Sequence, residues 1–325
     1  MKYLIIGGGS IAKRHIKNLH ILGANKIYCL KRQSDISFEK EFQCSVIASW
    51  EEAKQISPDI VFACNPTALH FEVVEFAEQV KAHLFMEKPL THSKDTLEKI
   101  KNIWTSSQVF FIGFMLRYHP LLQTIKTMLQ NKIIGDIYYA RFEFGSYLPG
   151  WHPDEDYKSG YAARKDLGGG VINTISHELD MMLFLLGEPN SVTAIAKNTG
   201  ILDIEVEEIA DAVFEYPFGL AHIHLDYLQK EYDRQIKILG TKGKITWNWH
   251  DNSVDVKKVD EKCYSIPMDN FIVNQLYLDE VTDFIKKVNN GTIKHDLDFD
   301  TAVTNSHWIL SMHSSIENQN KCQKS

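Results

Sequence analysis

The chain has 325 residues, of which 44% are hydrophobic, and it carries 35 lysines and arginines against 42 aspartates and glutamates. This length and apolar content are enough for a buried core and favour two domains over one. The formal charge of −7 and the lack of a long cationic run argue against a nucleic-acid partner and favour a small ligand.

Five cysteines are scattered along the sequence and form no CxxC pair, so neither a disulfide framework nor a metal site is indicated. The first apolar stretch, MKYLII, reaches glycines after about six residues, short of a signal-peptide core of roughly 7 to 15 or a membrane span of about 20. We therefore expect a cytoplasmic protein without a membrane segment.

From residue 1 to about residue 118, short β-rich runs alternate with longer helical stretches, which predicts a parallel sheet with crossover helices. Strands are expected within residues 2–6, 26–30, 45–49, 59–64, 83–87 and 109–114. Apolar residues at helical spacing predict helices within residues 12–23, 49–56, 67–80 and 92–104. The first part of the chain is therefore predicted to be a doubly wound α/β domain.

The segment YLIIGGGSIAKRHIKNL places Gly7, Gly9 and Ala12 as GxGxxA between an apolar strand and a helix. The first glycine permits a tight turn, the second lets a pyrophosphate approach the backbone, and the alanine lets the helix pack closely on the sheet. Helix-start amides, such as those of Ser10 and Ile11, supply N–H groups for the phosphates. This context predicts a Rossmann domain that binds a dinucleotide, and a glycine turn without a ligand is the alternative.

The residues after the second predicted strand bear on the choice of dinucleotide. An acidic residue that binds the ribose 2′-hydroxyl of NAD is usual about 20 residues after the glycine motif. The sequence YCLKRQSD instead offers Lys31 and Arg32, and such a cation pair favours the 2′-phosphate of NADP over NAD. The alternative is a solvated strand end, with Asp35 or a backbone group holding the ribose.

Past Pro120 the pattern changes to one helix, one strand, an aromatic loop, a second glycine run and then consecutive strands. Helices are expected within residues 120–131, 274–291 and 299–318, and strands within residues 137–145, 191–198, 211–219, 220–229, 234–240, 244–249 and 253–259. Turn sequences such as GTKG and PFG predict antiparallel pairing. Residues 119–325 are therefore predicted to be an α+β domain with a large, mostly antiparallel open sheet, whose last helices can pack back on residues 1–118.

Three further motifs follow predicted strands: CNPTALH at residues 64–70, MEKPL at residues 86–90 and GFMLRYHP at residues 113–120. Together with GGGSIA and GGGVINTISHELD, and in this order, they resemble the Gfo/Idh/MocA family of NAD(P)-dependent sugar oxidoreductases, which includes glucose-fructose oxidoreductase and inositol dehydrogenase. The resemblance covers most of the chain. It implies a Rossmann domain, a substrate domain, and hydride transfer between a nicotinamide and a hydroxyl or ketone of a sugar.

The loop CNPTALH lies at the carboxyl end of a predicted strand, where open α/β sheets bind ligands. Asn65 and Thr67 can hydrogen-bond a ribose or the nicotinamide side of a cofactor, and Pro66 fixes the turn. The resemblance assigns this loop to the cofactor. His70 is either a part of that contact or a helix-start cap or packing residue.

The motif MEKP places Glu87 and Lys88 at the end of the next strand. A residue before proline is biased away from helix, and its peptide bond can be cis, either of which would hold Lys88 out of the sheet and over the nicotinamide. A surface lysine is more often only solvated. The resemblance implies that Lys88 orients the reacting hydroxyl and that Glu87 lies close to the cofactor.

A single helix from residue 170 to residue 186 would place Asn173, His177 and Asp180 on one face, opposite an apolar face. Helix geometry alone is compatible with an exposed polar stripe. The resemblance instead implies that His177 faces the nicotinamide, where an imidazole can act as general base. HELDM is not HExxH, so zinc is not indicated.

The family usually has an aspartate, three residues and then the histidine, and here the sequence departs from it. Asn173 stands at the position counted back from His177, and Thr174 at the position counted forward from the glycines. Neither ionises at neutral pH, but either can hydrogen-bond the substrate or His177. The glycine run is therefore interpreted as a close approach to the cofactor and not as a second phosphate site.

Residues 145–170 form a long, aromatic-rich and charged loop bounded by glycines. Trp151, Tyr157 and Tyr161 can stack on a sugar ring, and we interpret the loop as a substrate lid, with a subunit contact as the alternative. Arg117 resembles a substrate contact of the family, and the alternative is an interdomain ion pair.

Two other functions are compatible with these motifs. A non-catalytic, dinucleotide-binding regulator would account for the missing aspartate, although the retained Lys88 and His177 oppose it. A redox-assisted glycosidase with tightly held NAD would keep the same fold. We further expect a homo-oligomer, a dimer or tetramer, formed through the C-terminal sheet, and a sugar derivative of surface-glycan metabolism as substrate.

Overall fold

The computed structural model describes residues 1–33, 35–105 and 107–322. Residues 1–115 and 273–306 form one compact unit, here unit 1. Residues 116–272 and the described residues from 307 onward form unit 2. Helix α10 (Phe299–Cys322) contributes its first residues to unit 1 and its remainder to unit 2.

Unit 1 is built on a six-stranded parallel sheet in the order β3-β2-β1-β4-β5-β6. Its strands are β1 (Tyr3–Ile6), β2 (Ile27–Leu30), β3 (Ser45–Ile47), β4 (Ile60–Ala63), β5 (His83–Glu87) and β6 (Phe110–Gly113). Every residue of β1 and β4 is buried, as expected for a parallel sheet with helices on both faces. The predicted doubly wound sheet is confirmed.

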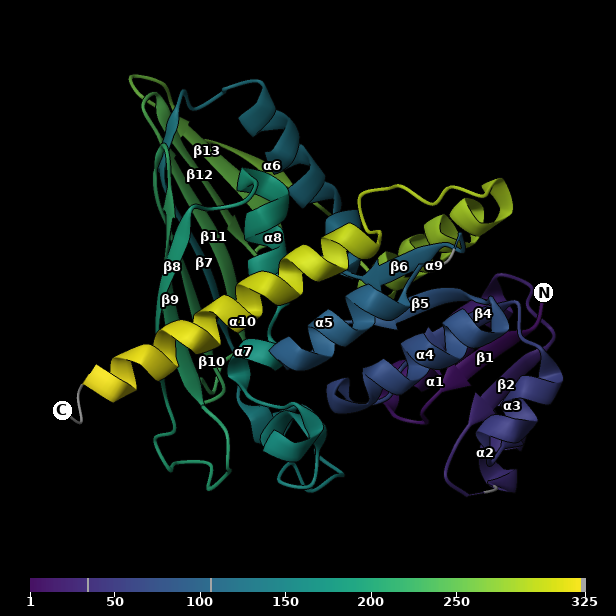
Figure 1. Cartoon of the computed structure of the whole chain (residues 1–325). Coiled ribbons are helices and arrows are strands. Elements are labelled where there is room, and N and C mark those ends of the chain that lie inside the picture. The colour runs from purple at the N-terminus through teal and green to yellow at the C-terminus, as the bar shows by residue number, and fades with distance from the viewer. Residues whose placement is uncertain (34, 106, 323–325) are drawn as a thin grey trace. The chain divides into compact units, whose positions relative to one another are not determined.

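Helices cover both faces of this sheet, with α1 (Ser10–Ile21) and α9 (Val273–Asn290) on one side and α4 (His70–Val80) and α5 (Lys94–Ile103) on the other (Figure 1). Phe284 of α9 packs against the rings of Phe62 and Phe85, at centroid distances of 5.7 and 5.5 Å. The remaining helices are α2 (Ile36–Phe42), which the sequence pattern did not predict, and α3 (Trp50–Ile56).

Unit 2 is built on an eight-stranded sheet in the order β14-β13-β12-β11-β7-β10-β9-β8. Its strands are β7 (Ile137–Gly145), β8 (Ser191–Lys197), β9 (Ile209–Tyr216), β10 (Gly219–Asp226), β11 (Asp233–Gly240), β12 (Gly243–Asn248), β13 (Ser253–Lys258) and β14 (Tyr264–Pro267). Strands β7 and β10 pair in parallel, and the other neighbours are antiparallel. The predicted α+β architecture with a mostly antiparallel sheet is confirmed.

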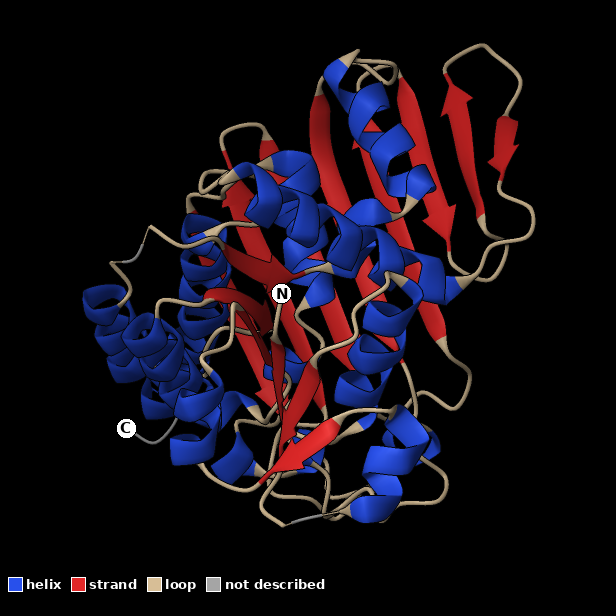
Figure 2. Cartoon of the chain, turned by 90° about the vertical axis from the view of Figure 1, so that its right-hand side faces the viewer, coloured by secondary structure: helices blue, strands red, loops and turns tan. Residues whose placement is uncertain are grey.

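One face of the eight-stranded sheet is covered by helices. Helices α6 (Pro120–Gln130), α8 (His177–Leu186) and the unit 2 part of α10 lie on the same side of it (Figure 1), and Figure 2 distinguishes strands from helices by colour. Trp308 of α10 packs on the Phe214 ring of β9 at 6.2 Å. On the opposite face, Ile195, Val213 and Leu220 are exposed, so this face presents apolar side chains to solvent.

Helix α6 begins at a histidine that is fully buried. Nδ1 of His119 accepts a hydrogen bond from the Leu121 amide at 3.2 Å and so caps the helix, and the ring packs against Trp247 and Phe271. Burial, and next the positive charge of Arg234, lower the pKa of His119 from 6.5 to about 4. The native state therefore holds this imidazole in its neutral form.

We expect this buried histidine to make the protein sensitive to acid. The unfolded chain binds a proton at about pH 6.5 and the native state only near pH 4, so stability present above pH 6.5 is lost as the pH falls toward 4. The expected loss is about 3 kcal/mol in the free energy of unfolding. Urea unfolding between about pH 7 and pH 4 measures it. His119→Asn keeps a capping acceptor and should flatten the profile, and equal slopes for both proteins would contradict this role.

No helix among the described residues has both the length and the apolar content that crossing a membrane requires.

Candidate cofactor and substrate sites

The first glycine run forms a turn that only glycine can make. Gly7 has φ +104°, and a Cβ atom there would lie 2.9 Å from the carbonyl oxygen of Cys64 in β4. A Cβ atom on Gly9 would meet nothing within 4 Å, so the space above this residue is open. Ala12 is fully buried on α1. Gly7, Gly9 and Ala12 thus have the three roles expected of the GxGxxA motif: a tight turn, an open approach for the ligand, and close packing of the helix.

The amides that follow this turn are available for a ligand. The Gly7 amide donates to the Leu30 carbonyl at 3.1 Å. In the part of the chain that the structure describes, no acceptor is found for the amides of Gly8, Gly9, Ser10 or Ile11, and no side chain caps α1. A row of unpaired N–H groups at a helix N-terminus fits the diphosphate of a dinucleotide.

The predicted cation pair after β2 is divided between two environments. Nζ of Lys31 lies 2.5 Å from Oδ2 of Asp35 and 4.0 Å from the centroid of the Phe38 ring, whereas Arg32 is exposed. Asp35 also caps α2 through the Phe38 amide. Its hydrogen bonds from Lys31, Ser37 and Phe38 hold the pKa of Asp35 well below its usual range. The carboxylate therefore neutralises one of the two cations.

The loop after β4 is held together by a buried histidine. His70 begins α4, and its Nδ1 lies 2.9 Å from the Pro89 carbonyl while its Nε2 lies 3.0 Å from the Asn65 carbonyl. Burial lowers its pKa. Thr67 is also buried, and Oδ1 of Asn65 has no hydrogen-bond partner among the described residues. These contacts match the packing alternative for His70 and leave the side-chain oxygen Oδ1 of Asn65 for a ligand.

The strand end at β5 carries a contact that sequence reasoning missed. Oε1 of Glu87 lies 2.7 Å from Nε2 of His15, which is fully buried on α1. This contact ties the motif after β5 to the helix of the glycine turn. Lys88 is partly exposed and its peptide bond with Pro89 is cis. The only sequence signal for His15 was a polar residue on the apolar face of α1.

The second glycine run uses its amides internally. Gly168, Gly169 and Gly170 donate to the carbonyls of Lys165, Arg164 and Ala162 at 3.0, 2.9 and 3.0 Å. The next two amides, of Val171 and Ile172, donate to the carbonyl and the carboxylate of Glu207 at 3.2 and 3.3 Å. The amides of residues 168–172 are therefore all bound within the protein and do not form a second phosphate site.

The prediction of one helix from residue 170 to residue 186 is wrong. The segment forms α7 (Val171–Thr174) and α8, and the chain turns at Ile175, whose ψ of 53° is not helical. The prediction of an exposed polar face opposite a buried apolar face also fails. Asn173 and Asp180, which were placed on the polar face, are only 5% and 1% exposed. His177 is the first residue of α8 and is partly exposed.

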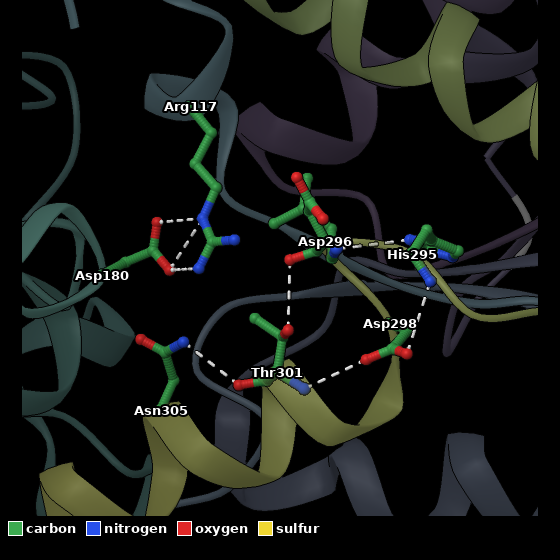
Figure 3. A network of polar contacts seen from close by, with 8 residues as sticks. Arg117, Asp180, His295, Asp296, Asp298, Thr301 and Asn305 are labelled. Carbon is green, nitrogen blue, oxygen red and sulfur yellow. Dashed lines mark hydrogen bonds and ion pairs between the residues drawn. The ribbon is translucent and has the colours of Figure 1, made fainter. Parts of the chain in front are cut away.

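Two buried ion pairs hold the first turn of α8. Oε1 of Glu178 lies 2.7 Å from Nε of Arg234 in β11. Asp180 faces Arg117 with both oxygens, at 2.6 Å to Nη2 and 2.9 Å to Nε (Figure 3). Both pairs lie within unit 2. With the predicted domain boundary between residues 118 and 119, the pair of Arg117 with Asp180 matches the ion-pair alternative, and a contact of Arg117 with the substrate stays a prediction. Both carboxylates follow His177 within the first turn of α8, and buried charge-assisted hydrogen bonds of this kind are stronger than neutral ones.

The long loop before the second glycine run is folded onto unit 2. Nε1 of Trp151 donates to Oγ of Ser146 at 2.9 Å, and the hydroxyl of Tyr157 donates to the Leu202 carbonyl at 2.9 Å. Tyr161 begins a short 3₁₀ helix, Tyr161–Ala163, and is partly exposed. The polar ends of two of the three predicted stacking residues are thus already bound, and their contact with a substrate stays a prediction.

A parallel sheet of this strand order, with a glycine turn and unpaired amides before its first helix, defines the class of dinucleotide-binding proteins. Residues 1–114 match the model of the oxidoreductase family with an NAD-binding Rossmann fold, and residues 122–246 match that of the GFO/IDH/MocA C-terminal domain. The chain therefore belongs to the Gfo/Idh/MocA family, and it is an oxidoreductase with an NAD-binding domain.

Individual relatives agree with this assignment. The chain is 29% identical over 280 residues to the uncharacterized oxidoreductase YrbE of Bacillus subtilis, covering 79% of this chain and 76% of the relative. It is 24% identical over 308 residues to myo-inositol 2-dehydrogenase of Thermotoga maritima, covering 90% and 89%. Levoglucosan dehydrogenase in complex with NADH has the same fold, with a TM-score of 0.86 at 17% identity and coverage of 98% and 97%.

Proposed function

We propose that this protein is an NAD-dependent dehydrogenase that oxidises a hydroxyl group of a sugar or cyclic polyol, or reduces the corresponding ketone. The observation that carries the proposal is the glycine turn, where Gly9 stands open and the amides of Gly8 to Ile11 have no acceptor among the described residues. Relatives named for inositol and levoglucosan support a polyhydroxylated ring as substrate.

The protein's own residues would bind the substrate and move its proton. When bound, the cofactor supplies the hydride acceptor. In the oxidation direction the carbon gives up its hydrogen with both bonding electrons, and the hydroxyl gives up its proton to a base. We assign the base to His177 and the polar contact to the reacting oxygen to Lys88. Asn173, Arg117 and the aromatic loop residues Trp151, Tyr157 and Tyr161 stay proposed substrate contacts.

NAD is the dinucleotide that the strand end after β2 favours. The Asp35 carboxylate neutralises Lys31 and would repel a 2′-phosphate, which leaves Arg32 as the second cation of the predicted pair. The sequence alone predicts the opposite preference, for NADP over NAD. Measuring the affinity for both dinucleotides distinguishes the two predictions.

We expect Asp35→Ala to change the cofactor preference. Without the carboxylate, Lys31 and Arg32 can both meet a 2′-phosphate, so the affinity for NADP should rise at least tenfold relative to that for NAD, a change of about 1.4 kcal/mol. Titration calorimetry with both dinucleotides measures the ratio. Asp136→Ala, which removes an exposed carboxylate in unit 2, is the matched control. A wild-type protein that already prefers NADP would contradict the assignment.

The exposed apolar residues on the open face of the eight-stranded sheet support a homo-oligomer formed through this face. We further propose a cytoplasmic location, which the scattered cysteines support because they form no disulfide framework. A role in surface-glycan metabolism is a separate proposal. Light scattering of the purified chain tests the oligomer.

The experiment that tests the function follows reduced nicotinamide while NAD is mixed with a panel of inositols, anhydrosugars and nucleotide sugars. Steady formation of NADH with one class supports the dehydrogenase. Binding of NAD without turnover across the panel would favour a dinucleotide-binding regulator. Cofactor that copurifies and never accumulates in reduced form, while a glycoside is cleaved, would favour the redox-assisted glycosidase.

A further inference from the structure

A second histidine reaches the segment that carries His177. His313 lies in the unit 2 part of α10, and its Nε2 is 2.9 Å from Oδ1 of Asn173 in α7. The two residues are 140 positions apart in the sequence. Asn173 is buried, so water competes little for this hydrogen bond.

The contacts of Asn173 define the direction of this hydrogen bond. Its Nδ2 donates to the carbonyl of Gly169 at 3.0 Å, which turns Oδ1 toward α10. An amide oxygen only accepts hydrogen bonds, so Nε2 of His313 must carry a proton and donate. The asparagine thus links the second glycine run to the C-terminal helix.

The part of α10 that carries His313 is anchored on both sides of this residue. Nε1 of Trp308 donates to Glu188, just after α8, at 3.3 Å. Oγ of Ser315 accepts a hydrogen bond from the Ala194 amide of β8 at 3.0 Å. Met312, which lies between Trp308 and Ser315 in the sequence, is buried. The imidazole is therefore presented from a fixed element.

Helix α7 depends on such outside contacts. It has four residues, and a single helical turn has little stability of its own. Glu207 binds its first amides, and Asn173 ties its body to Gly169 and to His313. Only Ile175 and Ser176 separate α7 from His177 at the start of α8. Any shift of α7 is therefore passed to the backbone of His177.

We infer that His313 is a positioning residue of the site: through Asn173 it holds the turn between α7 and α8 and thereby the imidazole of His177. This inference rests on the proposed function, in which His177 accepts the proton. His313 itself touches no reacting atom in this account.

The test compares two variants of similar size. His313→Leu fills the space but cannot donate, whereas His313→Gln can restore an N–H donor to Asn173. We expect His313→Leu to lower kcat about tenfold or more with little change in KM, and His313→Gln to recover most of it. Ser314→Ala, which alters an exposed neighbour on the same helix, should leave kcat unchanged. An unchanged kcat in folded His313→Leu would overturn the inference.

A second readout does not depend on turnover. The ring ¹H–¹⁵N resonances of His177 in the full chain should move in His313→Leu and return toward the wild-type positions in His313→Gln. If His313→Leu does not fold, Asn173→Ala removes the same hydrogen bond from its other end and must move the same resonances. Unmoved resonances would overturn the inference. A wild-type protein without turnover but with these NMR changes would refute the proposed function and leave the positioning contact standing.

Discussion

Replacing either Lys88 or His177 by alanine is expected to lower kcat for the preferred substrate by about 10²- to 10⁴-fold, the usual contribution of a general acid or base. Each variant should still bind NAD, because neither side chain belongs to the glycine turn. Stopped-flow or steady-state assays of NADH formation, with calorimetric titration of NAD beside them, separate the two effects.

The double variant tests whether the two residues act on the same proton. If both serve one step, Lys88→Ala/His177→Ala should be little slower than the slower single variant, because groups that act as a unit are not additive. Lys94→Ala and His250→Ala, which remove exposed side chains of the same types, are the matched controls. Single variants with wild-type kcat would remove both residues from the proposed mechanism.

Asp180→Ala is expected to cost about 3–5 kcal/mol in the free energy of unfolding, because it removes the carboxylate that both Nε and Nη2 of the buried Arg117 side chain contact. The side chains of Arg117 and Asp180 are only 10% and 1% exposed, so water cannot replace the lost carboxylate. Denaturant unfolding measures the change, and the helix start that carries His177 should loosen with it.

A paired substitution distinguishes the cost of losing this ion pair from the cost of a cavity. Arg117→Met/Asp180→Leu removes both charges and keeps apolar volume, so it should recover most of the lost stability. Asp166→Ala, which breaks an exposed pair with Arg164, should leave stability nearly unchanged. If Asp180→Ala behaves like Asp166→Ala, the ion pair does not support α8.

The sheets were predictable because their strands carry the pattern in the sequence. All six strands of unit 1 lie within the expected ranges, since parallel strands buried on both faces read as apolar runs. Strand β14 was missed because it is a short edge strand without a buried face, with the burial pattern of an exposed segment. Helix α2 was also missed, although α3, which has the same length of seven residues, was predicted.

The glycine turn was also predictable from local sequence, because the positive φ of Gly7 can be adopted without strain only by glycine. The break between α7 and α8 was not, since Ile175 is an ordinary helix residue and the turn is imposed by contacts from elsewhere. The contacts around this break join positions far apart in sequence: 56 residues for Glu178 and Arg234, and 140 for Asn173 and His313. Such pairings arise from tertiary packing and leave no local periodicity.

The most direct measurement uses a polyol that carries deuterium on the carbon to be oxidised, mixed with NAD and the full chain. We expect NMR and mass spectrometry to find the deuterium at C4 of the nicotinamide ring, in amounts equal to the ketone formed, and the transfer to be slowed about 10²- to 10⁴-fold in His177→Ala. Ketone formed without deuterium on the cofactor, or no binding of NAD to the protein, would contradict it.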